Sequence, residues 1–345
     1  MVYGYYSSGA DSEATLQDNI QAFKRRRLLP RIMVDVSHVD TSIILLGAKL
    51  ALPLLIAPMA MQQMAHPDGE LAVARAAAAA GTSMSVSTMA TYDLKDVASA
   101  GTGSPLLFFQ LYVIKDRDFT AKLLRDAAEA GYKALMVTVD APHLGYRQAD
   151  ERNEFSLPPP MGLRNLEGLQ SKGPDGSRSK SSISQVFTSQ IDPGLSWEFI
   201  AWLRTVSNLP IFVKGVLNPA DAHLAVQHSV DGIIVSNHGG RQLDFSPAAV
   251  DMVPAIRDAV GHRVPILVDG GVRSGTDIIK AIALGADAVL LGRPVLWGLA
   301  LEGQHGVAKV LETLRSELEL SMALCGAPTL AHITPSLLMG PMPRL

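Results

Sequence analysis

The stretch VPILVDGGVRSGTD, residues 264–277, contains the pattern that decides the fold. It begins with the apolar run 264–268, passes through Asp269 and two glycines, and ends where a helical pattern starts. A short apolar run without polar alternation is typical of a strand buried on both faces, as in a parallel sheet. The stretch therefore predicts one unit in which a buried strand leads through a polar, glycine-containing turn into a helix.

Seven more runs of this kind occur along the chain, and a segment with a helical pattern follows each. They are residues 52–57, 83–87, 106–111, 134–139, 210–213, 232–235 and 288–291. In the connections, residues 68–80 are rich in alanine, and Asn218 before Pro219 is typical of a helix start. Eight alternations predict a single (β/α)8 barrel over residues 1–345. About six would fit an open doubly wound sheet, but no dinucleotide-binding glycine pattern follows the first strand.

One long segment, residues 150–196, interrupts this rhythm after the fourth predicted strand. Its middle, residues 171–184, is rich in Ser, Gly and Lys. Loops that follow barrel strands lie at the catalytic face, so we expect this insertion to form a mobile active-site loop. A loop without function is the alternative, and the two interpretations are compatible because lids come from segments of low stability.

The composition restricts the class of protein. The 345 residues carry a formal net charge of −3, 48% are hydrophobic and 18% are charged. This balance predicts a folded chain with a large core and gives no reason to expect nucleic acid or an anionic membrane as a partner. Cys325 is the one cysteine in the sequence, which excludes an intramolecular disulfide framework. No apolar run is long enough to predict a membrane span.

Polar residues follow nearly every predicted strand, at the ends that converge on one site in a barrel. Because the runs themselves are apolar, this recurrence indicates a built site. The residues that follow the eight strands are Pro58, Met59 and Ala60; Ser87 and Met89; Gln110 and Tyr112; Thr138, Asp140 and Arg147; Lys214; Ser236, His238 and Arg241; Asp269, Gly271 and Arg273; and Gly292 and Arg293.

The last two of these loops carry the signal for a phosphate site. DGGVRSGTD (269–277) places Gly271 and Arg273 beside a helix start, and LGRP (291–294) adds Gly292 and Arg293. Glycines let backbone N–H groups approach an anion, helix N-termini favour negative charge, and arginine binds phosphate through paired hydrogen bonds. Barrels commonly bind phosphate at the loops after strands seven and eight. Each loop alone would also fit a turn with a surface arginine.

His238 and Arg241 stand three residues apart in SNHGGRQLD (236–244), with two glycines between them. That spacing lets an imidazole and a guanidinium face one small anionic substrate, with histidine as proton acceptor near neutral pH. Asp140 could hold the other ring nitrogen of the histidine, although a helix cap or turn residue is the alternative. Lys214 is a fixed cation in the site, a solvent-facing residue or a Schiff-base lysine of the kind that barrel aldolases use.

Together these stretches resemble the FMN-dependent L-2-hydroxy acid oxidases, the family of glycolate oxidase and L-lactate oxidase. The resemblance runs from Tyr5 to about Ile333 and is carried by GYYSSGA, LPLLIAPMAM, AHPDGE, FFQLYV, TVDAPHLGYR, VKGV, SNHGGRQLD, DGGVRSGTD and LGRPV. It implies a (β/α)8 barrel with FMN as cofactor. It also implies oxidation of a short-chain (S)-2-hydroxy acid to the 2-oxo acid, with O2 reduced to H2O2.

The resemblance further implies a role for each candidate residue. His238 would accept the substrate's hydroxyl proton, or its α-proton in a carbanion mechanism, with Asp140 in support. Tyr112 would contact the substrate oxygen, and Lys214 would stabilise the reduced flavin. The residues expected to bind the substrate are Tyr5, Met89, Tyr112, Arg147 and Arg241. Those expected to bind FMN are Pro58, Met59, Ala60, Ser87, Gln110, Thr138, Lys214, Ser236, Asp269, Gly271, Arg273, Gly292 and Arg293.

Two methionines depart from the pattern of the glycolate oxidases. Met89 stands where those enzymes have a tryptophan beside the substrate, and Met59 stands where they often have a threonine. Methionine is flexible and apolar, so the loss of tryptophan is expected to leave room for a substrate side chain. We therefore predict a preference for L-lactate over glycolate. A repacked pocket that still prefers glycolate is the alternative.

Further expectations concern the acceptor, the assembly and the location. O2 is the simplest acceptor, with a dehydrogenase that uses another acceptor and a catalytically silent flavin-binding barrel as alternatives. The resemblance implies a homo-oligomer, a tetramer or an octamer. The last residues, Pro343, Arg344 and Leu345, resemble a peroxisomal address; otherwise a cytoplasmic location is expected.

Overall fold

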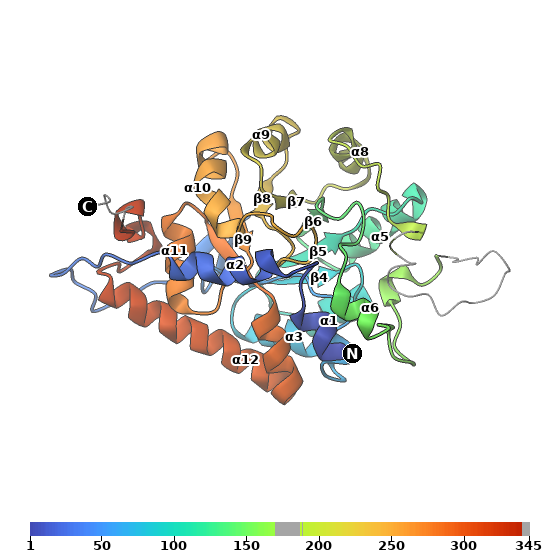
Figure 1. The fold of residues 1–345 in the computed structure, drawn as a ribbon, viewed down its shortest axis with the longest axis horizontal. Helices are drawn as coiled ribbons and strands as arrows, with labels where there is room; N and C mark the ends of the chain where they lie inside the picture. Colours follow the sequence, from blue (N-terminus) through green and yellow to red (C-terminus); the bar gives the residue numbers. More distant parts are fainter. Residues whose placement is uncertain (170–186, 188, 340–345) are drawn as a thin grey trace.

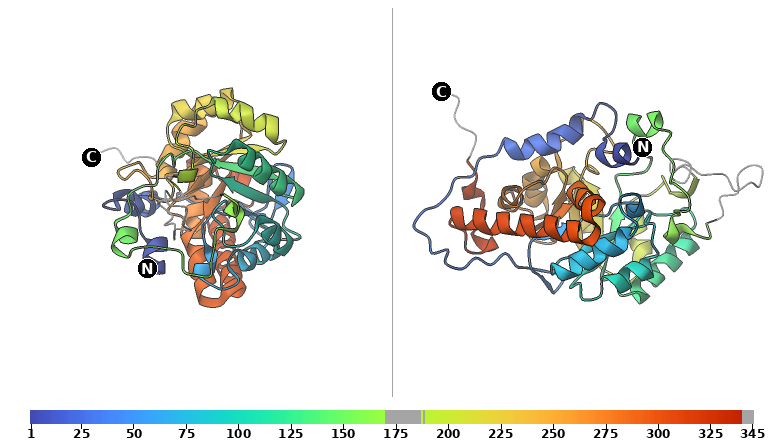
Figure 2. Two further views of the ribbon diagram at one scale, coloured as in Figure 1. Left: turned by 90° about the vertical axis from the view of Figure 1, so that its right-hand side faces the viewer. Right: turned by 90° about the horizontal axis from the view of Figure 1, so that it is seen from below.

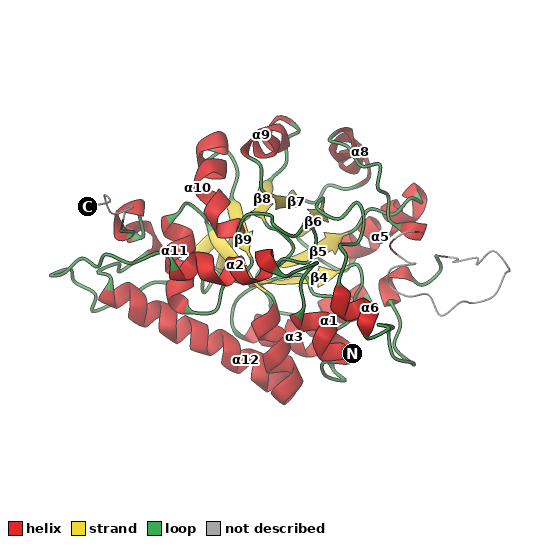
Figure 3. Ribbon diagram, in the orientation of Figure 1, coloured by secondary structure: helices red, strands yellow, loops and turns green. Residues whose placement is uncertain are grey.

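In the computed structural model, which describes residues 1–169, 187 and 189–339, eight parallel strands form a closed barrel surrounded by helices (Figures 1 and 3). The strands are β3 (Leu54–Ile56), β4 (Met84–Ser87), β5 (Leu107–Leu111), β6 (Ala134–Thr138), β7 (Ile211–Val216), β8 (Gly232–Val235), β9 (Ile266–Asp269) and β10 (Ala288–Leu291). Strand β10 pairs with both β9 and β3, so the last strand closes onto the first. The predicted (β/α)8 barrel is confirmed, and the open sheet is wrong.

Each barrel strand is followed by a helix on the outside of the barrel. These helices are α3 (Gly69–Ala79), α4 (Leu94–Ala100), α5 (Arg117–Glu129), α8 (Glu198–Val206), α9 (Pro219–Gln227), α10 (Ala249–Val260), α11 (Gly275–Ala283) and α12 (Arg293–Leu324). Helix α12 packs against both α3 and α11, so the outer ring closes as the barrel does (Figure 2). The predicted start of α9 is confirmed, because the Asn218 side chain accepts a hydrogen bond from the backbone N–H of Ala220 at 2.9 Å.

The strands agree with the prediction in number and order but differ at their ends. Strand β7 extends to Val216 instead of ending at residue 213, because Lys214 still pairs with Thr138 of β6 and Ile234 of β8. Lys214 is therefore held on a strand, with its neighbours on both sides, and not on a loop.

The interior of the barrel has an apolar floor and a polar top. The floor is one buried cluster that includes Leu55, Phe108, Met136, Phe212, Ile234, Leu267 and Leu290. Side chains alternate between the two faces of a strand, so the next inward positions lie two residues further on. Those positions hold the polar side chains of Gln110, Thr138, Lys214, Ser236 and Asp269, together with the small residues Ala57 and Gly292. The period of the strands thus places a polar layer at their carboxyl ends.

A hairpin that the sequence analysis did not predict covers the opposite end of the barrel. It consists of β1 (Ile43–Leu45) and β2 (Ala48–Leu50), and both Leu45 and Leu50 join the apolar floor. The chain passes from β2 directly into β3, so the hairpin lies at the amino ends of the strands. It supplies apolar cover to the floor, and the polar layer lies at the other end.

Two helices precede the hairpin, α1 (Val2–Ser7) and α2 (Ala14–Lys24), and α1 lies beside α6 (Gln148–Arg152) (Figure 1). The predicted insertion 150–196 contains part of α6 and the short helix η2 (Arg164–Leu166). Residues 171–184 and the tail Pro343, Arg344 and Leu345 lie outside the described residues, so their predicted roles stay predictions. Within the described part of the chain, no helix has the length and apolar character that crossing a membrane requires.

Candidate active site

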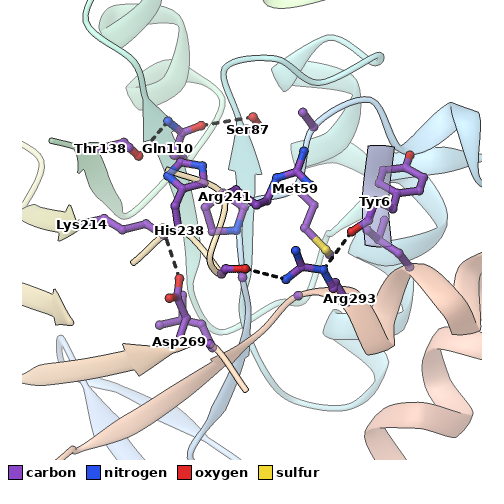
Figure 4. A pocket seen from close by; sticks show the side chains of 18 of the residues that line it. Tyr6, Met59, Ser87, Gln110, Thr138, Lys214, His238, Arg241, Asp269 and Arg293 are labelled. Atoms are coloured by element: carbon purple, nitrogen blue, oxygen red, sulfur yellow. Dashed lines mark hydrogen bonds and ion pairs between the residues drawn. The ribbon is translucent and has the colours of Figure 1, made fainter. Parts of the chain in front are cut away.

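The carboxyl ends of the barrel strands line a pocket of about 1080 Å³, a volume that includes its open mouth (Figure 4). All but two of the predicted site residues lie in its lining. The two exceptions, Asp140 and Ser236, contact the lining residues His238 and Lys214 respectively. The structure therefore brings the whole predicted set together, although it comes from all eight strand ends and from the N-terminal segment.

His238 is held in a turn that few residue types adopt. Its φ is 59°, and the two glycines that follow, Gly239 and Gly240, have φ values of 65° and 74°. The Ser236 Oγ accepts a hydrogen bond from the backbone N–H of His238 at 3.0 Å. A left-handed backbone outside glycine is uncommon and recurs at functional sites. This turn directs the imidazole into the pocket.

The two nitrogens of the His238 ring have different partners. The Asp140 Oδ1 lies 2.9 Å from Nδ1, and the Tyr112 hydroxyl lies 3.2 Å from Nε2. Burial raises the pKa of Asp140, but the His238 ring and the Lys214 ammonium outweigh burial and bring that pKa below its usual value. An ionised carboxylate can only accept, so Nδ1 carries the hydrogen and Nε2 presents its lone pair.

The imidazole itself is neutral near pH 7. Burial lowers the pKa of His238 more than the Asp140 carboxylate raises it, so the net value lies below the usual 6.5. In the structure the Tyr112 hydroxyl donates to the Nε2 lone pair. A neutral imidazole whose Nε2 is unprotonated is a proton acceptor, and the adjacent carboxylate can stabilise the cation that forms.

Arg147 and Arg241 form a cationic pair next to this base. Arg147 is 7% exposed, and its Nε donates to the Arg241 carbonyl oxygen at 3.3 Å. Arg241 Cζ lies 4.8 Å from the centre of the Tyr5 ring. Burial and the nearby Arg241 lower the pKa of Arg147 to about 10, so Arg147 remains charged at neutral pH. The Asp150 carboxylate lies 3.9 Å from the Arg147 guanidinium, too far for a hydrogen bond. An anionic ligand that binds between Arg147 and Arg241 would therefore reduce the repulsion between these two cations.

Lys214 is a buried ammonium with fixed partners. Its Nζ donates to Ser236 Oγ at 2.9 Å. It also lies 3.2 Å from Asp269 Oδ2 (Figure 4). Burial lowers the pKa of Lys214, but Asp269 and Asp140 raise it by more, so the net pKa lies above its usual value. A Schiff-base lysine must lose its proton to attack, so the aldolase interpretation loses its support.

Gln110 connects two strand ends through its side-chain amide. Ser87 Oγ donates to Gln110 Oε1 at 3.2 Å, and Gln110 Nε2 donates to Thr138 Oγ1 at 3.0 Å (Figure 4). These bonds fix which end of the amide faces which neighbour. The three side chains form a rigid polar row that can bind the edge of a heteroaromatic ring through several hydrogen bonds.

Arg293, at the start of α12, was predicted to bind phosphate, but its guanidinium already has partners within the protein. Its guanidinium donates to the backbone oxygens of Tyr6, Gly239 and Ser8 at 2.9, 3.0 and 2.9 Å. Burial and the neighbouring arginines lower its pKa to about 9. Three of its five N–H groups are used, and two remain for a ligand.

The two loops that were predicted to bind phosphate lead into helices α11 and α12, and the starts of these helices differ in the structure. In α11, the N–H groups of Ser274 and Gly275 are bound by Asp277 and Glu317 at 3.1 and 2.8 Å. Helix α12 begins after Gly292 without a side-chain cap, and Gly292 lines the pocket. The prediction for α11 is therefore weakened because protein carboxylates already use its donors, whereas the start of α12 stays open.

The pocket lining also has an apolar part, here called the apolar wall, and the sequence analysis found only some of its residues. Met59 and Met89 were predicted, but Tyr6, Leu144, Phe187 and Leu296 also line the pocket. Phe187 and Leu296 lie outside the quoted motifs, so nothing in the sequence points them towards the site. Tyr6, which follows Tyr5 in GYYSSGA, and Leu144, which lies in TVDAPHLGYR, could have been found.

Comparisons with known proteins agree with this geometry. The FMN-dependent dehydrogenase family matches residues 1–340. Glycolate oxidase from Spinacia oleracea is 51% identical over 336 residues, which cover 97% of this chain and 90% of that protein. A mandelate oxidase solved with (S)-4-hydroxymandelic acid has a TM-score of 0.90 at 39% identity, with 98% of this chain and 93% of that one covered. A protein named as lactate oxidase from Pediococcus acidilactici has a TM-score of 0.90 at 38% identity, with 98% and 89% covered.

The barrel and its pocket define a flavin-dependent oxidoreductase. The chain belongs to the FMN-dependent dehydrogenase family and, within it, to the FMN-dependent 2-hydroxy acid oxidases. The predicted family, enzyme class and cofactor are confirmed.

Proposed function

We propose that this enzyme oxidises a short-chain (S)-2-hydroxy acid with an apolar side chain, that it prefers L-lactate to glycolate, and that O2 is reduced to H2O2. The observation that carries the proposal is that one pocket lining combines cationic and apolar side chains. It includes the imidazole of His238 and the guanidinium groups of Arg147 and Arg241, together with Met59 and Met89. A molecule that carries both a carboxylate and a methyl group fits this combination.

His238 acts as the base. Its Nε2 lone pair accepts the proton of the substrate hydroxyl, or the α-proton if a carbanion forms first. The imidazolium that results lies 2.9 Å from the Asp140 carboxylate, which stabilises it. Tyr112, whose hydroxyl is 3.2 Å from the same nitrogen, contacts the substrate oxygen.

Arg147 and Arg241 bind the substrate carboxylate. Two guanidinium groups bind a carboxylate strongly and fix its orientation, which sets the α-carbon relative to His238. Tyr5 supports Arg241, since its ring lies under the guanidinium and its carbonyl oxygen accepts from Nη1 at 2.5 Å.

The remaining polar residues fit an FMN molecule. Among the described residues, Asp269 Oδ1 is a buried oxygen without a hydrogen-bond partner, so it suits a ribityl hydroxyl. Arg273, Gly292 and Arg293 would hold the phosphate. Gln110, Ser87, Thr138, Ser236, Gly271 and the backbone of Pro58, Met59 and Ala60 would hold the rest, with Lys214 placing a positive charge at the ring. When bound, FMN accepts two electrons from the substrate and passes them to O2.

The preference for L-lactate rests on the apolar wall. Met89 is 2% exposed and lines the pocket with Met59, Leu144, Phe187 and Leu296. Glycolate has no side chain to bury there, whereas the methyl group of lactate removes apolar surface from water. The mandelate and lactate oxidases among the structural neighbours, whose names imply acids with side chains, support the same direction.

Steady-state kinetics with peroxide detection test the substrate. We expect kcat/KM for L-lactate to exceed that for glycolate by about 10-fold, the scale of one methyl group in an apolar pocket. Met89→Trp should reduce or reverse this ratio because the indole fills the space. A wild-type preference for glycolate, the activity of the relative from Spinacia oleracea, would contradict the proposal.

A further inference from the structure

Glu70, in the first turn of α3, is a buried carboxylate outside the pocket lining. The residue is 0% exposed, and none of the ion pairs among the described residues includes it. A buried charge without a cation is costly unless hydrogen bonds replace its water. The contacts of Glu70 therefore show which groups replace that water.

The contacts of Glu70 come from two loops. Its Oε1 accepts from the backbone N–H groups of Gln62 and Thr91 at 2.9 and 3.0 Å, and its Oε2 accepts from the Thr91 hydroxyl at 2.7 Å. Thr91 Oγ1 in turn accepts from the N–H of Gln63 at 3.1 Å. Gln62 and Gln63 follow β3, whereas Thr91 follows β4. One carboxylate therefore joins the loops after two neighbouring strands.

These loops carry the two methionines of the apolar wall. Gln62 Nε2 donates to the carbonyl oxygen of Met59 at 3.2 Å, and the N–H of Met61 donates to that of Met89 at 3.1 Å. The start of α3 presses directly on the first loop, because a Cβ on Gly69 would lie 2.8 Å from the backbone nitrogen of Gln63. The helix that bears Glu70 and both loops thus form one packed unit.

We propose that Glu70 is a positioning residue that sets the distance between Met59 and Met89 and, through them, the selectivity of the pocket for the substrate side chain. The proposal deepens the proposed function and rests on it for the identity of the substrates. Glu70 acts through the hydrogen bonds that its two side-chain oxygens accept, and it takes no part in the reaction.

The selectivity ratio, kcat/KM for L-lactate divided by that for glycolate, tests the proposal because it does not depend on how much protein is folded. Thr91→Val, which keeps the shape but removes both a donor to Glu70 and the acceptor of the Gln63 N–H, should shift the ratio by about 5-fold, and Glu70→Ala should shift it by about 10-fold or more. Glu70→Gln should stay within about 2-fold, because its carboxamide oxygen can accept both backbone N–H groups.

Thr120→Val is the matched control, since Thr120 is a buried threonine of α5 whose hydroxyl donates to backbone oxygens away from the pocket. It should leave the ratio unchanged. An unchanged ratio in Thr91→Val would overturn the proposal, even if Glu70→Ala failed to fold. If the wild type oxidised neither acid, the proposed function would fail. The positioning role of Glu70 would then be tested by the dissociation constant of FMN. That constant should rise in Thr91→Val but not in Thr120→Val, because the same loop backbone lines the flavin site, and equal constants in the two variants would overturn the proposal.

Discussion

At the scale of single residues, two opposing influences act on the His238 imidazole. Burial lowers its pKa, whereas Asp140 raises it and, in the proposed mechanism, would stabilise the positive charge that His238 gains with the substrate proton. Neither burial alone nor the carboxylate alone would make His238 an effective base. Burial without the carboxylate gives a weak base, and the carboxylate without burial gives a histidine that is protonated before the substrate arrives.

The pH profile tests this balance. The base must be unprotonated, so kcat/KM should rise with pH through a pKa below 6.5. In Asp140→Asn the carboxylate no longer raises the pKa of His238, so the acid limb should move to lower pH. The maximal rate should fall by about 10²–10⁴-fold. An acid limb that stayed in place or moved upwards in this variant would show that Asp140 does not act on His238.

At the scale of elements, the N-terminal segment belongs to the site through one carboxylate of the loop after β8. Helix α2 has no cap from its own N-cap residue, Glu13. Instead Asp244 Oδ2 accepts from the N–H and hydroxyl of Ser12 at 3.0 and 2.6 Å, and Oδ1 accepts from the N–H of Thr15 at 2.9 Å. The segment so attached supplies the carbonyl oxygens of Tyr5 and Ser8 to Arg241.

Asp244→Ala should therefore weaken both the fold and the binding of substrate. Loss of the cap should cost about 1–2 kcal/mol of unfolding free energy, and KM should rise because Arg241 loses fixed acceptors. Asp93→Ala is the control, since Asp93 caps only α4 by accepting from the N–H of Lys95 at 2.8 Å. It should lower the melting temperature and leave KM unchanged. An Asp244→Ala enzyme with normal KM would contradict this role for the N-terminal segment.

The same carboxylate links stability to pH. Burial raises the pKa of Asp244, but hydrogen bonds from Ser12 and Thr15 outweigh it and lower the pKa to about 2. In the unfolded chain an aspartate titrates near 3.9. Its contribution is thus complete above pH 4 and is lost as the pH falls towards 2.

These elements also mark the limit of prediction from the sequence. The eight strands could be predicted because strands of a closed parallel barrel are buried on both faces and leave continuous apolar runs. The polar strand ends could be predicted because they interrupt those runs. The cap that Asp244 provides to α2 and the hydrogen bonds of Glu70 could not be predicted, because each joins residues that come close together only in the folded chain. The hairpin of β1 and β2 was missed because its three-residue strands are too short for a periodic signal.

At the scale of the whole molecule, the barrel separates stability from chemistry along its axis. The apolar floor, the hairpin and the outer helices hold the eight strand ends in place, and the polar layer above them is free to bind ligands. Beside this layer, Arg293 is repelled by the neighbouring Arg147, Arg241 and Arg273, which lower its pKa. A bound cofactor with a phosphate should thus stabilise the entire fold.

Removal of FMN should lower the melting temperature, and its return should restore it. A ligand at 100 times its dissociation constant adds about 2.7 kcal/mol, which corresponds to several degrees for a domain of this size. Riboflavin, which lacks the phosphate, should restore less because Arg273 and Arg293 gain no partner. Equal stabilisation by the two flavins in a thermal melt would place the phosphate elsewhere.

The most direct test of the account is anaerobic reduction of the bound flavin by L-lactate, followed through its visible absorbance. The wild-type enzyme should bleach on addition of L-lactate and regain its colour when air is admitted. The variant His238→Asn should bind FMN normally but bleach about 10²–10⁴-fold more slowly, because no group remains to accept the substrate proton. Bleaching of the variant at the wild-type rate would contradict the claim that His238 is the base.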